Sequence, residues 1–363
     1  MLLNKFHPRQ LAIVGYSGSG KTTLIEKLLF HFRKQQLLVG IIKHDTHHLN
    51  LDKEGKDSYR FWQAGATAVV AHNQHEQFSR IKASYNLREE YFQSCDFLLV
   101  EGHKHSEFPK IVFLDENMSL WHDFDDDKKK TAIAFIGTLN KCPIKTERPY
   151  FQRDAVQEIA HFILDYFKQQ TASIALKGLI VAGGHSSRMG QDKSKLNYHG
   201  LAQYKWAYNL LKNAELDAYI SCRPDQNFDL PIIKDTVLGQ GPLGGILSAL
   251  QAYPNTAFLT IAVDQPNLTL ETVQHLIHQR NSFRHASAYT DQEQLEPLCC
   301  VYEPSFKAIG FNALGKDECS PKRILENAHT QRIPVPRPDD LANSNTQQDY
   351  HQLQQLIASP HET

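Results

Sequence analysis

Short apolar runs alternate with amphipathic stretches along the first half of the chain. Buried strands are predicted at residues 11–14, 37–42, 97–100, 110–114 and 131–137. After the first of these, apolar side chains recur at helical spacing, at Leu24, Ile25, Leu28, Leu29 and Phe32. Strands that alternate with helices predict a parallel sheet covered on both faces. The charged run DFDDDKKK, residues 123–130, predicts a solvated loop.

A second alternation of the same kind follows a polar stretch near the middle of the chain. Asp154 can cap a helix running to about Phe167, and KQQTAS at 168–173 then marks a domain boundary. Beyond it we expect strands within 174–181, 218–222, 231–235 and 257–264, and helices near 201–213, after GPLGG and near 270–280. Each half has a glycine-rich loop after its first strand. Open α/β sheets bind ligands at the carboxyl ends of strands, so we expect a phosphate ligand at both loops.

Composition and charge narrow the class of protein. Of the 363 residues, 41% are hydrophobic and 22% charged, which is typical of a soluble globular chain. A net charge of -1 gives no general attraction to nucleic acid or to a membrane surface. No apolar stretch is long enough to span a membrane, and the start, MLLNKFHPRQ, turns polar too early for a secretory signal. The six cysteines form no CxxC pair, which favours reduced thiols in the cytoplasm over a zinc site or disulfides.

The first glycine loop, GYSGSGKT at residues 15–22, fits the pattern G-x-x-x-x-G-K-[ST] between a strand and a helix. Its glycines let backbone N–H groups curl around phosphates, and the helix N-terminus adds partial positive charge. We expect Lys21 to reach the β- and γ-phosphates and Thr22 to ligate Mg²⁺. The residues predicted to bind the nucleotide are Gly15, Ser17, Gly18, Ser19, Gly20, Lys21, Thr22, Thr23 and Glu101.

Two further segments of this half carry polar groups at strand ends. Glu101 ends FLLVE and is suited to hold the magnesium ion or its water. IIKHDTHH brings His44, His47 and His48 together after another strand. Such histidines can ligate a metal, contact phosphate or be polar loop residues, and the sequence leaves these alternatives open.

Three segments of the first half together resemble the MobB family, the GTP-binding accessory proteins of molybdenum cofactor biosynthesis. They are SGSGKTTL, IIKHDTHHLNLDKEGKDSYRFWQAGA and LLVEGHKHSEFPKIV, and the resemblance covers roughly residues 9–168. The long middle segment is more specific than a generic nucleotide motif. The resemblance implies GTP binding, weak GTP hydrolysis at most and an adaptor role. The P-loop by itself does not select guanine.

The second glycine loop lies within LIVAGGHSSRMGQDKSKL, residues 179–196, and is of another kind. It lacks the G-K-[ST] of a Walker motif, and it does not fit G-x-G-x-x-G. Gly183 and Gly184 have no side chains, so a nucleoside triphosphate can lie against the main chain. Arg188 is suited to bind the departing β- and γ-phosphates through a bidentate fork. Lys193 can neutralise the charge that grows on the α-phosphorus.

Charged and amide side chains follow the strands of the second half. Asp264 ends a long apolar strand, where a carboxylate is costly to bury unless it is paired or metal-bound, so we expect it to ligate magnesium. Asp235 precedes a glycine-rich turn and can accept hydrogen bonds from guanine N1–H and N2–H, or contact the ribose. Lys322 and Arg323 are suited to a phosphate.

The order of these pieces resembles the MobA family of molybdenum cofactor guanylyltransferases, from about residue 176 to the end. Its motifs are VAGGHSSRMGQDK, KDTVLGQGPLGG, AVDQP and NSNT. The resemblance implies transfer of GMP from GTP to Mo-molybdopterin, which yields molybdopterin guanine dinucleotide and pyrophosphate. The implied GTP contacts are Val181, Ala182, Gly183, Gly184, Lys193, Asp235 and Asp264. The expected pterin side is Lys322, Arg323, Asn343 and Asn345.

The chain departs from the family pattern at a few positions. Gln347 stands where members often have a proline, and Gln265 where threonine or methionine is usual before Pro266. The strand AYISCR lacks an asparagine that some relatives carry, which weakens any nucleotide contact assigned there. None of these departures removes a charged group that the chemistry needs.

The expected fold class is α/β with two doubly wound domains. A P-loop NTPase domain is expected over residues 1–170 and a Rossmann-like nucleotidyltransferase domain over 174–363. The expected cofactor is Mg²⁺. The expected partners are GTP, Mo-molybdopterin, the enzymes of molybdopterin synthesis, and apo-molybdoenzymes or their chaperones, with no nucleic acid and no membrane. Two alternatives remain: cytidylyl transfer to the same pterin, whose enzymes usually have A-A-G at 182–184, and a GTP-switched cofactor chaperone without transferase activity.

Overall fold

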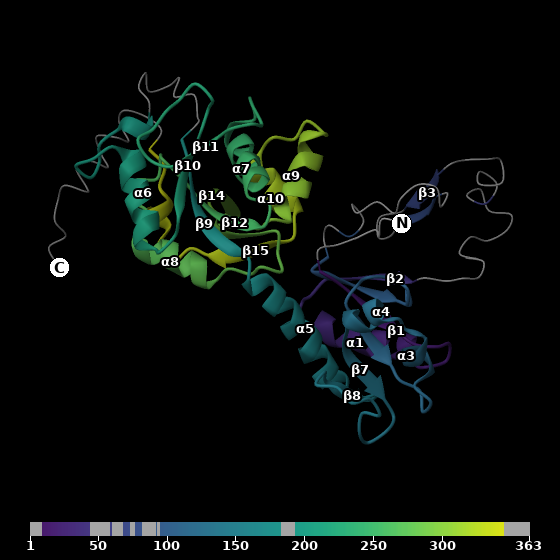
Figure 1. The fold of residues 1–363 in the computed structure, drawn as a ribbon. Helices are drawn as coiled ribbons and strands as arrows, with labels where there is room; N and C mark the ends of the chain where they lie inside the picture. The colour runs from purple at the N-terminus through teal and green to yellow at the C-terminus, as the bar shows by residue number, and fades with distance from the viewer. Residues whose placement is uncertain are drawn as a thin grey trace. The chain divides into compact units, whose positions relative to one another are not determined.

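The computed structural model describes residues 9–43, 59, 68–72, 77–81, 92, 95–182 and 193–344 (Figure 1). The chain divides into two compact units, residues 1–163 and 164–363. The division falls within α5 (Val156–Ala172), which is longer than predicted and includes most of the polar segment 168–173. Lysine and glutamine are good helix formers and no glycine or proline interrupts this segment, so the helix continues through it.

The described strands of the first unit form a six-stranded sheet in which every neighbouring pair is parallel, as the alternating pattern predicts. Its order is β2-β5-β1-β6-β7-β8. The bounds are β1 (Gln10–Val14), β2 (Val39–Lys43), β5 (Phe97–Glu101), β6 (Lys110–Phe113), β7 (Ala132–Gly137) and β8 (Tyr150–Gln152). The short strand β8 was not predicted. A separate antiparallel pair, β3 (Ala68–His72) and β4 (Gln77–Ile81), was not predicted either.

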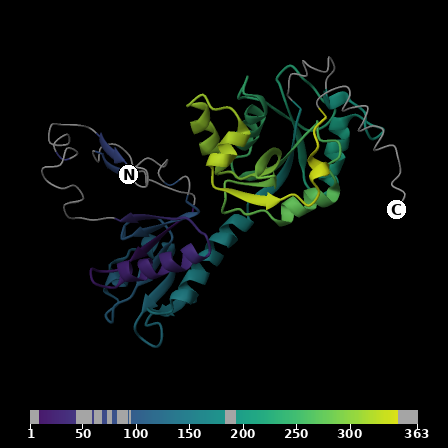
Figure 2. The same ribbon diagram turned by 180° about the vertical axis from the view of Figure 1, so that it is seen from behind.

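Helices cover both faces of this sheet. The helix α1 (Lys21–Lys34) buries one apolar stripe, and its Phe32 meets Phe97 of β5 edge-on, with the ring centroids 5.1 Å apart. The rings of His31 in α1 and His161 in α5 lie 6.2 Å apart, so the two helices are neighbours (Figure 2). On the other face, α3 (Ser119–Asp123) adds Leu120 to a buried apolar cluster.

The charged run 123–130 contains a helix, α4 (Asp126–Thr131), so the prediction of a loop was wrong for most of it. The carboxylate of Asp125 caps the helix by accepting a hydrogen bond from the backbone N–H of Lys128 at 2.9 Å. Acidic residues fill the first turn and lysines the last, which complements the helix dipole. The charges of this run therefore support a short helix while still facing solvent.

The described strands of the second unit form a seven-stranded mixed sheet with the order β11-β10-β9-β12-β14-β13-β15. The bounds are β9 (Ala175–Val181), β10 (Ala218–Cys222), β11 (Ile232–Lys234), β12 (Thr256–Ala262), β13 (Ala286–Asp291), β14 (Gln294–Tyr302) and β15 (Thr330–Pro334). The first four strands in this order are parallel, as predicted. Beyond them, β14 runs antiparallel to both β12 and β13.

Two layers of helices enclose this second sheet (Figures 1 and 2). The helices α6 (Gln203–Asn213) and α8 (Leu270–His278) pack on one face, with Ile180 in the shared core cluster. The helices α7 (Gly241–Ala252), α9 (Phe306–Leu314) and α10 (Pro321–Asn327) pack on the other, with Leu179 in their cluster. Neighbouring residues of one strand thus face opposite layers, as side-chain alternation requires.

All six cysteines belong to the described part of the chain and carry free thiols, and Cys222, Cys299 and Cys300 are buried. Among the helices of the described residues, none has the length and apolar character that a membrane crossing requires.

Candidate nucleotide-binding sites

The first glycine loop joins β1 to α1, in the strand–loop–helix context that its motif requires. Gly18 and Gly20 have φ angles of 74° and 93°, in the left-handed region that favours glycine. A Cβ on Gly15 would lie 2.7 Å from the Oγ of Ser19, so the loop closes too tightly for a side chain there. No side chain of the described residues caps α1, so its first backbone N–H groups suit an anion such as phosphate.

The structure brings together the three charged and hydroxyl groups expected at this loop. The hydroxyl of Thr22 donates a hydrogen bond to Glu101 Oε1 at 2.7 Å. The ammonium of Lys21 donates to the carbonyl oxygen of Tyr16 at 2.7 Å. Burial lowers the pKa of Lys21. The negative charge of Glu101 acts in the opposite direction, and the positive charge of Lys43 lowers this pKa further. A hydroxyl beside a carboxylate is a donor set that fits Mg²⁺, with Glu101 binding directly or through water.

Two predicted contact residues and one unpredicted arginine lie at or beside this loop. Ser17 is exposed on the loop, and Thr23 is exposed in the first turn of α1. Arg153, which follows β8, lies against the loop, because a Cβ on Gly20 would be 3.6 Å from its Cδ and 3.8 Å from its Cζ. Its exposed guanidinium can reach a bound nucleotide. No sequence pattern pointed to Arg153, since β8 is too short to predict and the topology alone brings the strand's end to the loop.

In the second unit, Lys193 and Asp264 come together although they are far apart in sequence. Lys193 opens a short 3₁₀ helix (Lys193–Lys195), and its Nζ lies 3.4 Å from Asp264 Oδ2 in a partly buried ion pair. The other carboxylate oxygen of Asp264, Oδ1, is buried and has no hydrogen-bond partner among the described residues. Such an orphaned anionic oxygen is costly, and a divalent cation would satisfy it. Asp264 therefore fits the predicted magnesium ligand.

The loop that carries the predicted Asn343 docks beside Asp264. The backbone N–H of Ser344 donates to the backbone carbonyl of Asp264 at 2.8 Å, and the hydroxyl of Tyr198 donates to Ser344 Oγ at 2.7 Å. This anchoring places the exposed Asn343 close to the Lys193–Asp264 pair.

Four predicted site residues lie outside the described residues, namely Gly183, Gly184, Arg188 and Asn345. The clustered histidines His44, His47 and His48 also lie outside them.

Asp235 directly follows β11, at the carboxyl end of that strand. Its carboxylate accepts a hydrogen bond from Ser221 Oγ at 2.7 Å. Burial raises the pKa of Asp235, while this hydrogen bond and the charge of Arg223 oppose the rise. The backbone N–H of Ala182 donates to the carbonyl of Ser221 at 3.1 Å, so the start of the glycine loop adjoins the partner of Asp235. A Cβ on Gly245 would lie 2.1 Å from Ser221 Oγ, which explains a glycine in GPLGG.

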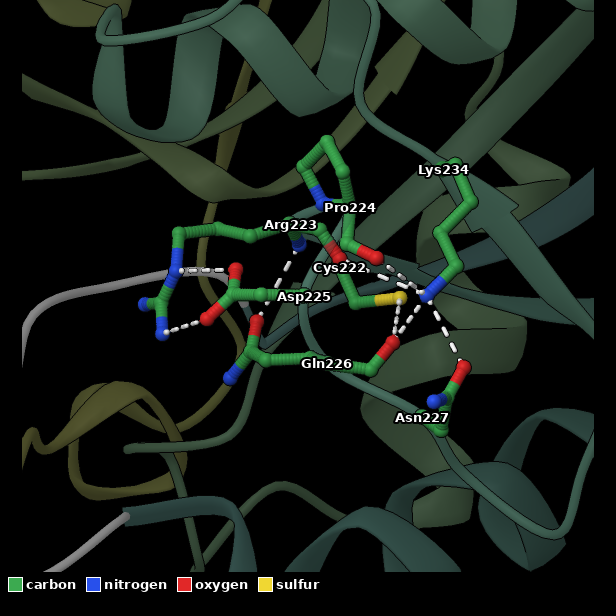
Figure 3. A network of polar contacts seen from close by, with 7 residues as sticks. All are labelled: Cys222, Arg223, Pro224, Asp225, Gln226, Asn227 and Lys234. Atoms are coloured by element: carbon green, nitrogen blue, oxygen red, sulfur yellow. Dashed lines mark hydrogen bonds and ion pairs between the residues drawn. The ribbon is translucent and has the colours of Figure 1, made fainter.

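The loop after β10, where some relatives have an asparagine, is held by Lys234 (Figure 3). The Lys234 ammonium donates to the carbonyl of Pro224 at 3.2 Å and to Asn227 Oδ1 at 3.1 Å, and it also contacts the carbonyl of Gln226. Lys234 directly precedes Asp235. The network therefore fixes the position of the backbone directly before Asp235.

A cavity of about 520 Å³ lies on the far side of Asp264 from Asp235 in the strand order. Lys322 of α10 and Asn343 both line it, so the structure brings these two predicted pterin-side residues together. Arg323 does not line this cavity; its guanidinium pairs with Glu318 at 3.4 Å on the exposed side of α10. The adjacent residues 322 and 323 thus point to different surroundings.

Both halves of the chain match described protein families. Residues 10–137 match the model of molybdopterin guanine dinucleotide synthesis protein B (MobB), and residues 178–331 match that of the MobA-like NTP transferase domain. The chain is 34% identical over 193 residues to the molybdenum cofactor biosynthesis bifunctional protein of Synechocystis, a match that covers 51% of this chain and 56% of that protein. The chain thus spans little more than half the length of this relative.

Two shorter relatives are matched over most of their length. The molybdopterin-guanine dinucleotide biosynthesis adapter protein of Haemophilus influenzae is 33% identical over 159 residues, which cover 42% of this chain and 86% of the adapter. A probable molybdenum cofactor guanylyltransferase of Clostridium perfringens is 32% identical over 186 residues, which cover 48% of this chain and 93% of that protein. With the P-loop of the first unit and the Lys193–Asp264 pair of the second, these matches show that the chain belongs to the MobB family in its first half and to the MobA-like NTP transferases in its second.

Proposed function

We propose that the second unit transfers GMP from GTP to Mo-molybdopterin, and that the first unit serves it as a GTP-binding adaptor. The observation that carries the proposal is the Lys193–Asp264 pair, together with Asp264 Oδ1, for which the described part of the chain offers no hydrogen-bond partner. Asp235 lies on one side of this pair in the strand order and the cavity with Lys322 on the other, so two substrates can meet between them. The names of the relatives, guanylyltransferase and adapter protein, agree with this division.

In the transfer, the terminal phosphate oxygen of molybdopterin attacks the α-phosphorus of GTP in line, and pyrophosphate leaves. Positioning and charge neutralisation suffice for such a step, so no covalent enzyme intermediate is needed. Lys193 offsets the negative charge that grows on the α-phosphate. A phosphate monoester is already largely a dianion near neutral pH, so a general base is dispensable. Magnesium held by Asp264 supplies further charge neutralisation to the phosphate oxygens when bound.

The first unit would bind GTP through its P-loop, with Lys21 on the phosphates and Thr22 and Glu101 at a magnesium ion. Fusion of the two units fixes their stoichiometry and raises their effective concentration towards the millimolar range. The adaptor can hand over GTP or cofactor, or dock an apo-molybdoenzyme or its chaperone. We place the reaction in the cytoplasm, where the six free thiols stay reduced.

The test mixes the purified chain, Mg²⁺ and Mo-molybdopterin with either GTP or CTP and detects products by mass spectrometry. We expect molybdopterin guanine dinucleotide and an equal amount of pyrophosphate with GTP. Transfer from CTP in preference to GTP would make the second unit a cytidylyltransferase. GTP hydrolysis without pyrophosphate would instead indicate a GTP-switched chaperone.

A further inference from the structure

Strand β14, which the sequence did not predict, brings a second carboxylate to the edge that holds Asp264. It runs antiparallel to β12, and Cys299 lies opposite Ile261 in the register. Asp264 follows Ile261 by three residues, and Glu296 precedes Cys299 by three. In an antiparallel pair these two displacements run in the same direction. Glu296 therefore lies at the same edge of the sheet as Asp264, one strand further along.

Glu296 lines the cavity together with Lys322 and Asn343. One of its carboxylate oxygens, Oε1, accepts a hydrogen bond from the backbone N–H of Leu298 at 2.8 Å, which fixes the side chain. Burial raises the pKa of Glu296 and the charge of Asp264 adds to this, whereas the hydrogen bond from Leu298 and the charge of Lys322 oppose it. A partly buried carboxylate with a fixed orientation is suited to accept hydrogen bonds from a ligand.

The cavity's charges suit a ring with N–H donors better than a triphosphate. Of the described residues that line it, three are acidic, Asp291, Glu296 and Asp339, and one is a cation, Lys322. Its volume of about 520 Å³ falls in the range of small-molecule sites. An aminopyrimidinone ring presents a ring N–H beside an exocyclic amino group, and a carboxylate can accept from both donors. Guanine and pterin both have this edge, so the donors alone do not tell them apart.

The strand order decides between the two rings. Asp235 follows β11, and Asp264 follows β12. Strands β10 and β9 lie between β11 and β12 in the sheet. With adjacent strands about 4.8 Å apart, this separation is roughly 14 Å. Strand β9, which the glycine loop follows in the sequence, lies on the Asp235 side of β12, so we infer that a nucleotide with its α-phosphate at Asp264 extends towards Asp235. The ring at Glu296, on the opposite side, then belongs to the acceptor substrate.

We propose that Glu296 binds the N3–H and 2-amino edge of the pterin and so helps to select the acceptor substrate. This inference rests on the proposed transfer to a molybdopterin. The two carboxylates on either side of Asp264 then recognise the same hydrogen-bonding edge in two different substrates: Asp235 recognises guanine and Glu296 recognises pterin. Lys322, on the same cavity wall, is available to the acceptor's anionic groups.

The binding test uses the full-length chain and a fluorescent ligand, 6-hydroxymethylpterin phosphate, and does not depend on catalysis. We expect Glu296→Gln to weaken binding about ten- to hundredfold, because charge-assisted hydrogen bonds to the ring are lost. The control is Glu293→Gln, an exposed residue of the same hairpin outside the cavity lining, which should bind normally. The matching lumazine phosphate has oxygen in place of the 2-amino group. It should bind the unmodified protein more weakly and respond little to Glu296→Gln.

The kinetic test measures KM for both substrates in the same variants. Glu296→Gln should raise KM for Mo-molybdopterin about ten- to hundredfold and leave KM for GTP unchanged. A raised KM for GTP alone would overturn the proposal in favour of a guanine site, and a lower kcat with both KM values unchanged would overturn it in favour of support for Asp264. Equal binding of pterin and lumazine phosphates to the unmodified protein would overturn it even if the variant failed to fold. If the unmodified protein bound the pterin but formed no dinucleotide, the proposed transfer would fail and this inference would stand.

Discussion

The two glycine loops occupy the same place in their units, directly after the first strand, yet the sites around them are assembled differently. In the first unit, one contiguous segment supplies Lys21, Thr22 and the closing glycines, and Glu101 is the main group added from elsewhere. In the second unit, the groups come from separate strand ends and loops, as Lys193 and Asp264 show. A site in which backbone N–H groups do most of the binding can be contiguous. A site that must align two substrates draws its groups from several strands.

The largest effect is expected from a substitution of Asp264, which should impair the site of the second unit and leave the P-loop of the first unit unaffected. Asp264→Ala removes the carboxylate whose Oδ1 has no partner among the residues that the structure describes, so turnover should fall roughly 10²- to 10³-fold. GTP binding at the P-loop should be unchanged, because that loop belongs to the other unit. Steady-state rates of dinucleotide formation and titration with a fluorescent GTP analogue measure the two effects. Near-normal turnover would refute the metal assignment.

The next largest effect is expected for Lys193→Ala, which should lower kcat roughly 10²-fold. The ammonium lies 3.4 Å from Asp264 Oδ2 and is placed to neutralise the α-phosphate. The matched control is Lys195→Ala, two residues along on the same short helix and exposed, which should keep kcat within a small factor. Equal losses in the two variants would show that the local charge, and not the position of Lys193, is what matters.

Substitution of a glycine tests whether the backbone of the first glycine loop needs the left-handed conformation. Gly20→Ala places a side chain at a φ of 93°, which should cost about 1–2 kcal/mol of stability, whereas its distance to Arg153 would be an ordinary contact. Gly315→Ala is the control, since its φ of -64° is ordinary for alanine. Urea unfolding of both variants gives the free energies. A Gly20→Ala protein as stable as the control would mean that the loop relaxes out of the left-handed region at little cost.

The smallest expected effect is a pH dependence in the first unit. Lys110 is fully buried, its ammonium donates to the carbonyl of Ser106 at 2.5 Å, and burial lowers its pKa to about 8. An unfolded lysine titrates near 10.4, so between these values the unfolded chain binds the extra proton and stability rises with pH. Below about pH 8 the destabilisation by the buried charge is fully present.

The matching variant is Lys110→Met, which removes this titration. The stability of the unmodified protein relative to the variant should rise from pH 8 to pH 10, by at most about 1.4 kcal/mol per pH unit. Lys104→Met, at an exposed position, should show no such change. A difference between Lys110→Met and the unmodified protein that stays constant across this range would contradict the lowered pKa.

Local patterns predicted much of the architecture. Most of the parallel strands of both units, the helices α1, α6 and α8 and the strand–loop–helix context of the P-loop follow from apolar periodicity and a contiguous motif, and the structure confirms them. The parallel strands β8 and β15 were not predicted. The prediction of a loop over residues 123–130 was wrong for most of that run, because Asp125 caps a helix that begins inside it. A second difference is the continuation of α5 through a segment with no helix breaker.

Groups that converge only through topology could not be predicted. Arg153 reaches the P-loop from the end of β8, and Glu296 reaches the edge near Asp264 only because β14 runs antiparallel to β12. Neither belongs to a motif, and no spacing in the sequence connects either one to its site. Lys322 and Arg323 show the same limit at short range: they are adjacent, yet only Lys322 lines the cavity.

The most direct test of the central claim compares Lys21→Ala and Asp264→Ala in one reaction with Mg²⁺, saturating GTP and Mo-molybdopterin. We expect Lys21→Ala to form the dinucleotide and pyrophosphate at close to the normal rate, with a defect only in delivery to an apo-molybdoenzyme. We expect Asp264→Ala to form almost none. The reverse result, with dinucleotide formation lost in Lys21→Ala and kept in Asp264→Ala, would refute transfer at the Lys193–Asp264 pair.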